Sequence, residues 1–149
     1  MKILVIHGPN LNALGWREPE KYGHTTLEEV NARLQELAEE AGVELECFQS
    51  NHEGAILDRL HQARGEIDVI ILNPGGLTHH GGAVRDALNA LKIPTVDVHI
   101  TNIWARQRDY EHNLLESEVI APVCVGQITG FGVFSYELAF RAALHIGSK

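Results

Sequence analysis

Polar side chains follow three apolar runs of this chain, each near the position where the run ends. They are Asn10 and Asn12, then Asn73 and His79, and last His99 with Thr101. Amides and hydroxyls orient small polar ligands, and a histidine can exchange a proton near neutral pH. Because loops at the carboxyl ends of parallel strands border the crevice of an open α/β sheet, we expect the three clusters to converge on one ligand site. Each residue alone could instead cap a helix or close a turn, and only the repetition at successive strand ends favours a site.

Tyr22 is a candidate general base. It lies near the end of segment 7–23, which is far longer than the usual βα connection of about 2–6 residues, so we expect a binding loop or lid there. Arg17 in this segment and Arg106 further along supply cations that would stabilise a phenolate, and a tyrosinate can accept a proton. His99 would suit the complementary acid. A lone tyrosine or histidine is more often a packing or structural residue, and that alternative stays open.

Two other chemistries are suggested by short motifs but are not expected. The turn at 73–76, Asn-Pro-Gly-Gly, resembles a phosphate-binding loop, but no Lys-Ser/Thr pair follows the glycines, so we expect no nucleotide. His79 and His80 are adjacent and therefore point in different directions, and no cysteine or paired carboxylate completes a set of ligands. We therefore expect no metal ion.

The composition limits the partners of the chain. Its 149 residues carry a net charge of −8 and no basic stripe, which argues against nucleic acid. The apolar run 3–6 is too short for a signal peptide, and no run approaches the roughly 20 residues of a membrane span, so we expect no membrane association. Cys47 and Cys124 form no disulfide framework, which favours a reduced, cytoplasmic protein. The length predicts one domain over residues 1–149.

Apolar runs alternate with amphipathic stretches along the whole chain. Thr26 begins a capping box, and the helix that follows should end at Gly42. The alternation predicts an α/β, flavodoxin-like three-layer fold, because right-handed crossovers leave few other arrangements. We expect a five-stranded parallel sheet in the order 2-1-3-4-5 with helices on both faces. The expected strands are 2–6, 43–48, 67–72, 94–100 and 119–125, and the expected helices are 27–41, 53–63, 83–91 and 134–146.

Four motifs of this chain resemble, in order and spacing, those of the type II 3-dehydroquinate dehydratases, small flavodoxin-like enzymes of the shikimate and quinate pathways. The motifs are GPNLNALGWREPEKYG (8–23), QSNHEG (49–54), ILNPGGLTH (71–79) with RDAL (85–88), and VHITN (98–102). The resemblance covers nearly the whole chain. It implies anti elimination of water from 3-dehydroquinate to give 3-dehydroshikimate through an enolate, without a metal or an organic cofactor.

The resemblance also implies roles for matching positions. Tyr22 matches the base beside the substrate ketone, Arg17 the lid arginine that stabilises its deprotonated form, and Arg106 a second supporting arginine. Asn10 matches the asparagine associated with the enolate, and His99 matches the acid that protonates the leaving hydroxyl.

Further positions match groups that hold the substrate or a neighbouring subunit. Asn73 lies beside the acid, the backbone amides of Ile100 and Thr101 match those that bind the substrate carboxylate, and His79 matches a hydroxyl-binding residue. We expect Glu53 to orient His99. The family forms dodecamers, as tetramers of trimers, in which an aspartate matching Asp86 reaches into a neighbour's site.

The chain departs from the family pattern after residue 102. Segment 106–113 replaces a usual REEFRHxS pattern, and Tyr110 stands in register where a second arginine binds a substrate hydroxyl. Arg108 lies two positions earlier, so its contact with the substrate is left open. Two alternatives therefore stand beside the main prediction: a related dehydratase for a different β-hydroxy ketone, and a catalytically silent ligand-binding homologue.

Overall fold

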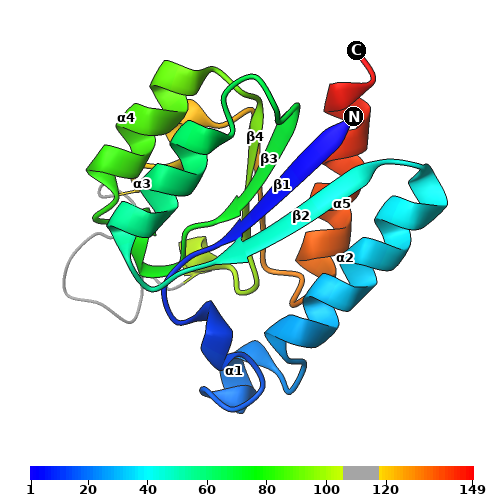
Figure 1. Ribbon diagram of the computed structural model, residues 1–149. Coiled ribbons are helices and arrows are strands. Elements are labelled where there is room, and N and C mark those ends of the chain that lie inside the picture. The colour runs from blue at the N-terminus through cyan, green and yellow to red at the C-terminus, as the bar shows by residue number, and fades with distance from the viewer. Residues whose placement is uncertain (106–117) are drawn as a thin grey trace.

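The computed structural model describes residues 1–105 and 118–149 and contains a five-stranded parallel sheet in the order β2-β1-β3-β4-β5 (Figure 1). This order confirms the predicted one. The central strands are almost wholly buried, which explains the continuous apolar runs of β1 and β3, whereas β4 alternates polar and apolar residues. The strands are β1 Lys2–His7, β2 Glu44–Gln49, β3 Val69–Asn73, β4 Thr95–His99 and β5 Gly126–Thr129.

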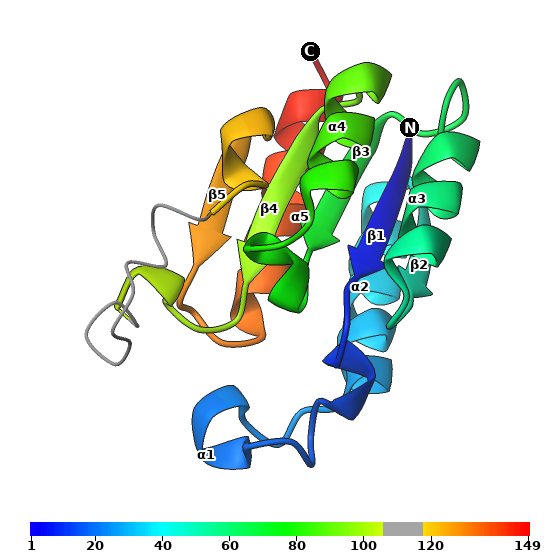
Figure 2. The same ribbon diagram turned by 90° about the vertical axis from the view of Figure 1, so that its left-hand side faces the viewer.

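Helices cover both faces of the sheet. One pair, α2 (Leu27–Ala41) and α5 (Phe134–Gly147), packs on one face, and α3 (Glu53–Gln62) and α4 (Gly82–Leu91) pack on the other (Figures 1 and 2). Neighbouring residues of a strand face opposite layers, so Val5 belongs to the core under α2 and α5 whereas Leu4 belongs to the core under α3 and α4. The result is the predicted three-layer arrangement.

The helix α2 begins and ends where the sequence predicts. The Thr26 hydroxyl accepts a hydrogen bond from the Glu29 backbone N–H at 3.2 Å, and Gly42 ends the helix in the left-handed region, at φ 68°. The predicted bounds of α3, α4 and α5 hold to within one residue.

The fifth strand is not where the sequence predicts it. The apolar run 119–125 contains a 3-10 helix, η5 (Ala121–Val123), and β5 begins only at Gly126. Pro122 lies inside that run and has no N–H to donate to a strand partner, which explains why the run reaches β4 only at its last residue, where the Val125 N–H donates to the Thr95 carbonyl at 2.8 Å. The long segment 7–23, expected as a loop, also contains short helices, η1 (Leu11–Ala13) and α1 (Pro19–Tyr22).

Among the described residues, no helix is both long and apolar enough to cross a membrane.

Candidate active site

A pocket of about 160 Å³ opens where β1, β3 and β4 end. Both views show α1 at this end of the sheet, beyond the arrowheads of the strands (Figures 1 and 2). The three polar clusters therefore do converge, as the strand-end argument predicts. The predicted site residues that line the pocket are Asn10, Arg17, Tyr22, Asn73, His79, His99, Ile100 and Thr101.

Two loops meet backbone to backbone on one side of the pocket. The Gly8 N–H donates to the Asn73 carbonyl at 2.8 Å. A Cβ on Gly8 would lie 2.4 Å from the Pro74 carbonyl oxygen, and one on Gly75 would lie 2.8 Å from the Pro9 oxygen. No side chain fits in so small a space. Close packing of the β1 and β3 loops therefore explains Gly75 of the turn that resembles a phosphate-binding loop, whereas a Cβ on Gly76 would meet no atom within 4 Å.

The 49–54 motif holds Asn10 in place. Asn51 accepts a hydrogen bond from the Asn10 backbone N–H at 2.9 Å through its Oδ1. Gln49 donates through Nε2 to the same oxygen, at 3.2 Å, and to the Gly8 carbonyl, at 3.3 Å. These bonds support Asn10 in the left-handed backbone conformation, at φ 70°, which is uncommon for a residue other than glycine.

Two cations of its own segment lie beside the ring of Tyr22. The Arg17 guanidinium carbon is 5.2 Å and the Lys21 ammonium nitrogen 5.7 Å from the centre of the Tyr22 ring. Both distances are within the range of cation–π attraction. Arg17 is also paired with Glu18, with its Nε 3.7 Å from Glu18 Oε2. The geometry thus supports the sequence argument for Arg17 and adds Lys21.

A buried hydrogen-bond chain orients Asn73. Its Nδ2 donates to the Tyr136 hydroxyl at 3.0 Å, and its Oδ1 accepts from the Gly75 N–H at 3.2 Å. The Tyr136 hydroxyl lies 3.0 Å from His7 Nδ1, and His7 Nε2 lies 2.8 Å from Asn31 Oδ1. An amide oxygen only accepts, so Nε2 carries the hydrogen, and a neutral His7 ring then accepts from Tyr136 at Nδ1.

Burial keeps the side chains of this hydrogen-bond chain uncharged. It lowers the pKa of His7 to about 4, although the hydrogen bond with Asn31 acts in the opposite direction. Burial also raises the pKa of Tyr136, against the hydrogen bond from Asn73. These side chains are therefore neutral at physiological pH. Each donates one hydrogen bond to the next, from Asn73 through Tyr136 and His7 to Asn31.

His99 is held by Asp97, two residues earlier on β4. The His99 Nε2 lies 2.9 Å from Asp97 Oδ2, and the same oxygen accepts from Gln127 Nε2 at 2.8 Å. A carboxylate oxygen only accepts, so Nε2 carries a hydrogen and Nδ1 is left to exchange a proton with a ligand. Our expectation that Glu53 orients His99 is wrong, because Asp97 takes that place.

Asp97 was not singled out by the sequence reasoning, although the sequence contains a signal for it. Alternate residues of a strand project to the same side, so an aspartate two positions before a histidine in the same strand places both on one face. Its partner Gln127 pairs with Asp97 in the register of β4 with β5, which depends on where β5 begins.

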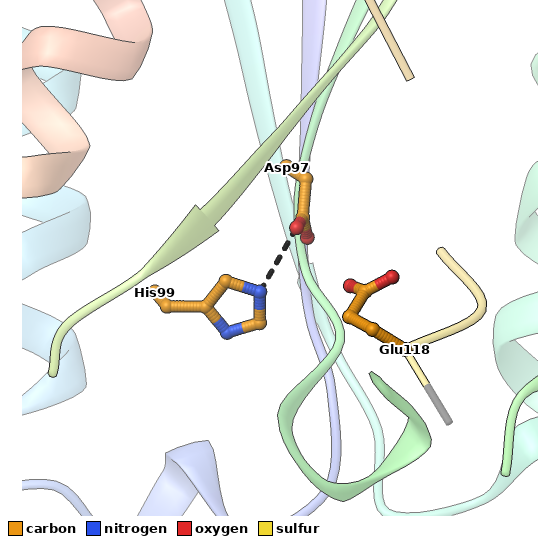
Figure 3. A group of neighbouring side chains, drawn as sticks. All are labelled: Asp97, His99 and Glu118. Carbon is orange, nitrogen blue, oxygen red and sulfur yellow. Dashed lines mark hydrogen bonds and ion pairs between the residues drawn. The ribbon is translucent and has the colours of Figure 1, made fainter. Parts of the chain in front are cut away.

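Glu118 adds a second carboxylate to this pair. One ligand atom each from Asp97, His99 and Glu118 lies within 4.8 Å of the other two, and the Glu118 carboxyl group faces the pair (Figure 3). This pairing of carboxylates is not visible in the sequence, because Glu118 comes from a segment distant from β4. Such a set could ligate a cation, but Asp97 Oδ2 already accepts two N–H groups.

One further predicted residue lies outside the pocket. Asp86, in α4, does not line the pocket, and its side chain is 72% exposed and paired with Arg85 at 3.2 Å. Arg106 and Arg108 fall outside the described residues.

Known proteins resemble this chain over nearly its full length. The sequence model of the family Dehydroquinase class II matches residues 1–144. The 3-dehydroquinate dehydratase of Desulforudis audaxviator is 53% identical over all of this chain and 96% of its own. That of Pelotomaculum thermopropionicum is 54% identical over 96% of each chain. The crystal structure of a type II dehydroquinase from Butyrivibrio crossotus superimposes with a TM-score of 0.88, at 41% identity and 97% coverage of both chains.

Proposed function

This chain belongs to the class II dehydroquinase family and is a hydro-lyase that removes water from 3-dehydroquinate, and we propose that the pocket at the ends of β1, β3 and β4 is where it does so. The observation that carries the proposal is the meeting, in one pocket, of a tyrosine beside two cations and a histidine held by a carboxylate. Elimination of water from a β-hydroxy ketone needs such a base and such an acid.

Tyr22 is the proposed base. Its ionised oxygen takes the proton from the carbon next to the substrate ketone, and the electron pair of the C–H bond passes into an enolate. Arg17 and Lys21 stabilise the phenolate before the transfer. Asn10, held by Asn51, is the proposed donor to the enolate oxygen. Closure of the 15–23 segment over the pocket would exclude water during this step.

His99 is the proposed acid. The enolate re-forms the ketone as the bond from carbon to the β-hydroxyl breaks, and the leaving oxygen takes a proton from His99 Nδ1 to become water. Asp97 holds the opposite ring nitrogen, which keeps Nδ1 directed away from the carboxylate (Figure 3). The product is the conjugated ketone 3-dehydroshikimate, and a proton then returns from Tyr22 to His99 through solvent.

The other lining groups are proposed to bind the substrate. Ile100 and Thr101 follow β4 directly, and their backbone N–H groups suit the substrate carboxylate. Local donors of this kind are needed because the net charge of −8 on the protein does not attract an anion. Asn73 and His79 suit ring hydroxyls. Because Asn73 is held at both ends of its amide, it presents a defined donor to the pocket. Arg106 and Arg108 stay candidates for supporting the base and for binding a hydroxyl.

We also propose a homododecamer built from four trimers, in which Asp86 completes the pocket of a neighbour. Its exposed side chain outside its own pocket supports this role. Sedimentation velocity should show the dodecamer, and Asp86→Ala should weaken turnover in an assembled enzyme. A monomeric active enzyme would exclude the proposal. The free thiols of Cys47 and Cys124 support a cytoplasmic location.

The test is turnover of purified protein with 3-dehydroquinate, followed by the ultraviolet absorbance of the conjugated product. Tyr22→Phe should lower kcat by about 10²–10⁴-fold, the usual contribution of a general base. Glu20→Gln, an exposed change on the same short helix α1, serves as the matched control and should leave kcat within about twofold of the wild type.

Two results would contradict the assignments. Equal rates for Tyr22→Phe and the control would exclude Tyr22 as the base. A folded wild type without product would favour a different β-hydroxy ketone or a silent homologue, and substrate analogues lacking single ring hydroxyls would separate these two.

A further inference from the structure

Two buried carboxylate oxygens beside the proposed acid have no hydrogen-bond partner among the described residues. They are Asp97 Oδ1 and Glu118 Oε1. The second oxygen of each group is satisfied, since Asp97 Oδ2 accepts from His99 and Gln127 and Glu118 Oε2 accepts from the Ala121 backbone N–H at 2.9 Å. A buried charged oxygen without a donor is costly, so the two unpaired oxygens require an explanation.

The two carboxyl groups lie close together. Atoms of Asp97, His99 and Glu118 are mutually within 4.8 Å, Asp97 is fully buried and Glu118 is 9% exposed. Two carboxylates this close, each with one oxygen shielded from water, disfavour each other's ionisation. Asp97 has two N–H donors, one of them on the imidazole, so it is the group better suited to carry the negative charge.

The surroundings of Glu118 favour its neutral form. Burial raises the pKa of the Glu118 carboxyl and the negative charge of Asp97 raises it further, whereas the Ala121 and Ile120 backbone N–H groups and the His99 imidazole act in the opposite direction. A further titratable group nearby is Cys124, the residue after η5, and burial raises the pKa of its thiol to about 12, so it adds no charge.

We propose that Glu118 retains its proton in the folded enzyme and donates it through Oε1 to Asp97 Oδ1, which makes Glu118 a positioning residue for His99. One hydrogen bond then satisfies both unpaired oxygens. Asp97 is held by three donors, from β4, from β5 and from the segment before η5, and cannot rotate away from the imidazole. No proton is transferred in this arrangement, because the O–H bond stays on Glu118.

A single negative charge behind the acid has a chemical consequence. An imidazolium paired with one carboxylate is neutral overall, whereas a second ionised carboxylate would hold the Nδ1 proton more tightly and slow its release to the leaving oxygen. This inference rests on the proposed role of His99 as the acid. The shared proton itself does not depend on that role and can be measured without substrate.

The first experiment is infrared difference spectroscopy of the wild type and Glu118→Gln at neutral pH. We expect the wild type to show the C=O stretch of a protonated carboxyl group, and Glu118→Gln to lack it. Absence of the band in the wild type, or its persistence in Glu118→Gln, would overturn the proposal. Failure of the enzyme to convert 3-dehydroquinate would instead overturn the proposed function and leave this result intact.

The second experiment compares Glu118→Gln with Glu118→Ala in turnover. A glutamine amide can donate to Asp97 and accept from Ala121, so it should rescue kcat to within about threefold of the wild type, and its rate should lack the pH dependence caused by Glu118 ionisation. Alanine leaves Asp97 Oδ1 unpaired and should lower kcat on the order of tenfold while KM changes little. Equal losses in both variants would show that the carboxyl proton has no positioning role. If Glu118→Ala does not fold, the infrared comparison still decides.

Discussion

Acidification should destabilise this protein through His7. The folded state holds His7 neutral, with a pKa of about 4, whereas the unfolded chain has the ordinary value of 6.5. Between these pH values the unfolded chain binds a proton at His7 that the folded protein does not bind, so the free energy of unfolding falls as the pH falls. At about 1.4 kcal/mol for each pH unit, the contribution of His7 lost between pH 6.5 and 4 is about 3 kcal/mol.

The assay is urea denaturation at a series of pH values, with protein concentration held constant because assembly would add a concentration-dependent term. Other groups titrate in the same range, so the control is His7→Asn, which has no proton to gain. Between pH 7 and 4.5 the wild type should lose about 2–3 kcal/mol more than His7→Asn does. Equal losses would refute the reasoning, because they would mean that His7 titrates alike in both states.

Three further predictions follow from particular contacts. Tyr136→Phe removes a buried hydroxyl that joins His7 to Asn73. It should lower the free energy of unfolding, measured in urea, by about 2–4 kcal/mol and should raise KM for 3-dehydroquinate. An unchanged KM would show that Asn73 needs no support from Tyr136. Gly75→Ala adds a Cβ 2.8 Å from the Pro9 carbonyl oxygen at φ 57° and should cost about 2 kcal/mol or more in thermal or urea unfolding. Its matched control is Gly76→Ala, where no atom lies within 4 Å of the added carbon, and similar losses in the two variants would contradict the close-packing argument. Arg17→Gln removes a cation 5.2 Å from the centre of the Tyr22 ring and should lower kcat about 10-fold or more. Lys21→Gln removes a cation that is 5.7 Å away and should have the smaller effect. A larger loss in Lys21→Gln would show that Lys21, and not Arg17, is the main cation that supports the base.

Local patterns in the sequence were sufficient to predict four of the five strands, the four long helices and the strand order. Helical periodicity and capping depend on neighbouring residues only, so the bounds of α2 were predicted correctly, and the right-handed crossovers between strands then left few sheet orders to consider. The fifth strand was misplaced because an apolar run indicates burial without indicating pairing, and Pro122 interrupts the pairing. Tyr22 and His99 could be found because both occupy recognisable positions, a long loop and a strand end.

The sequence by itself determined which chemical groups this protein carries at the ends of its strands and, through strand order, that they meet at one edge. Only the tertiary structure decided what holds those groups in place. His7 and Tyr136 lie 129 residues apart and meet because α5 packs over β3, the strand that pairs with β1. Glu118 reaches Asp97 only because the segment before η5 packs against β4. Such contacts depend on packing between distant segments, where hydrogen-bond partners are selected by distance and burial rather than by separation along the chain.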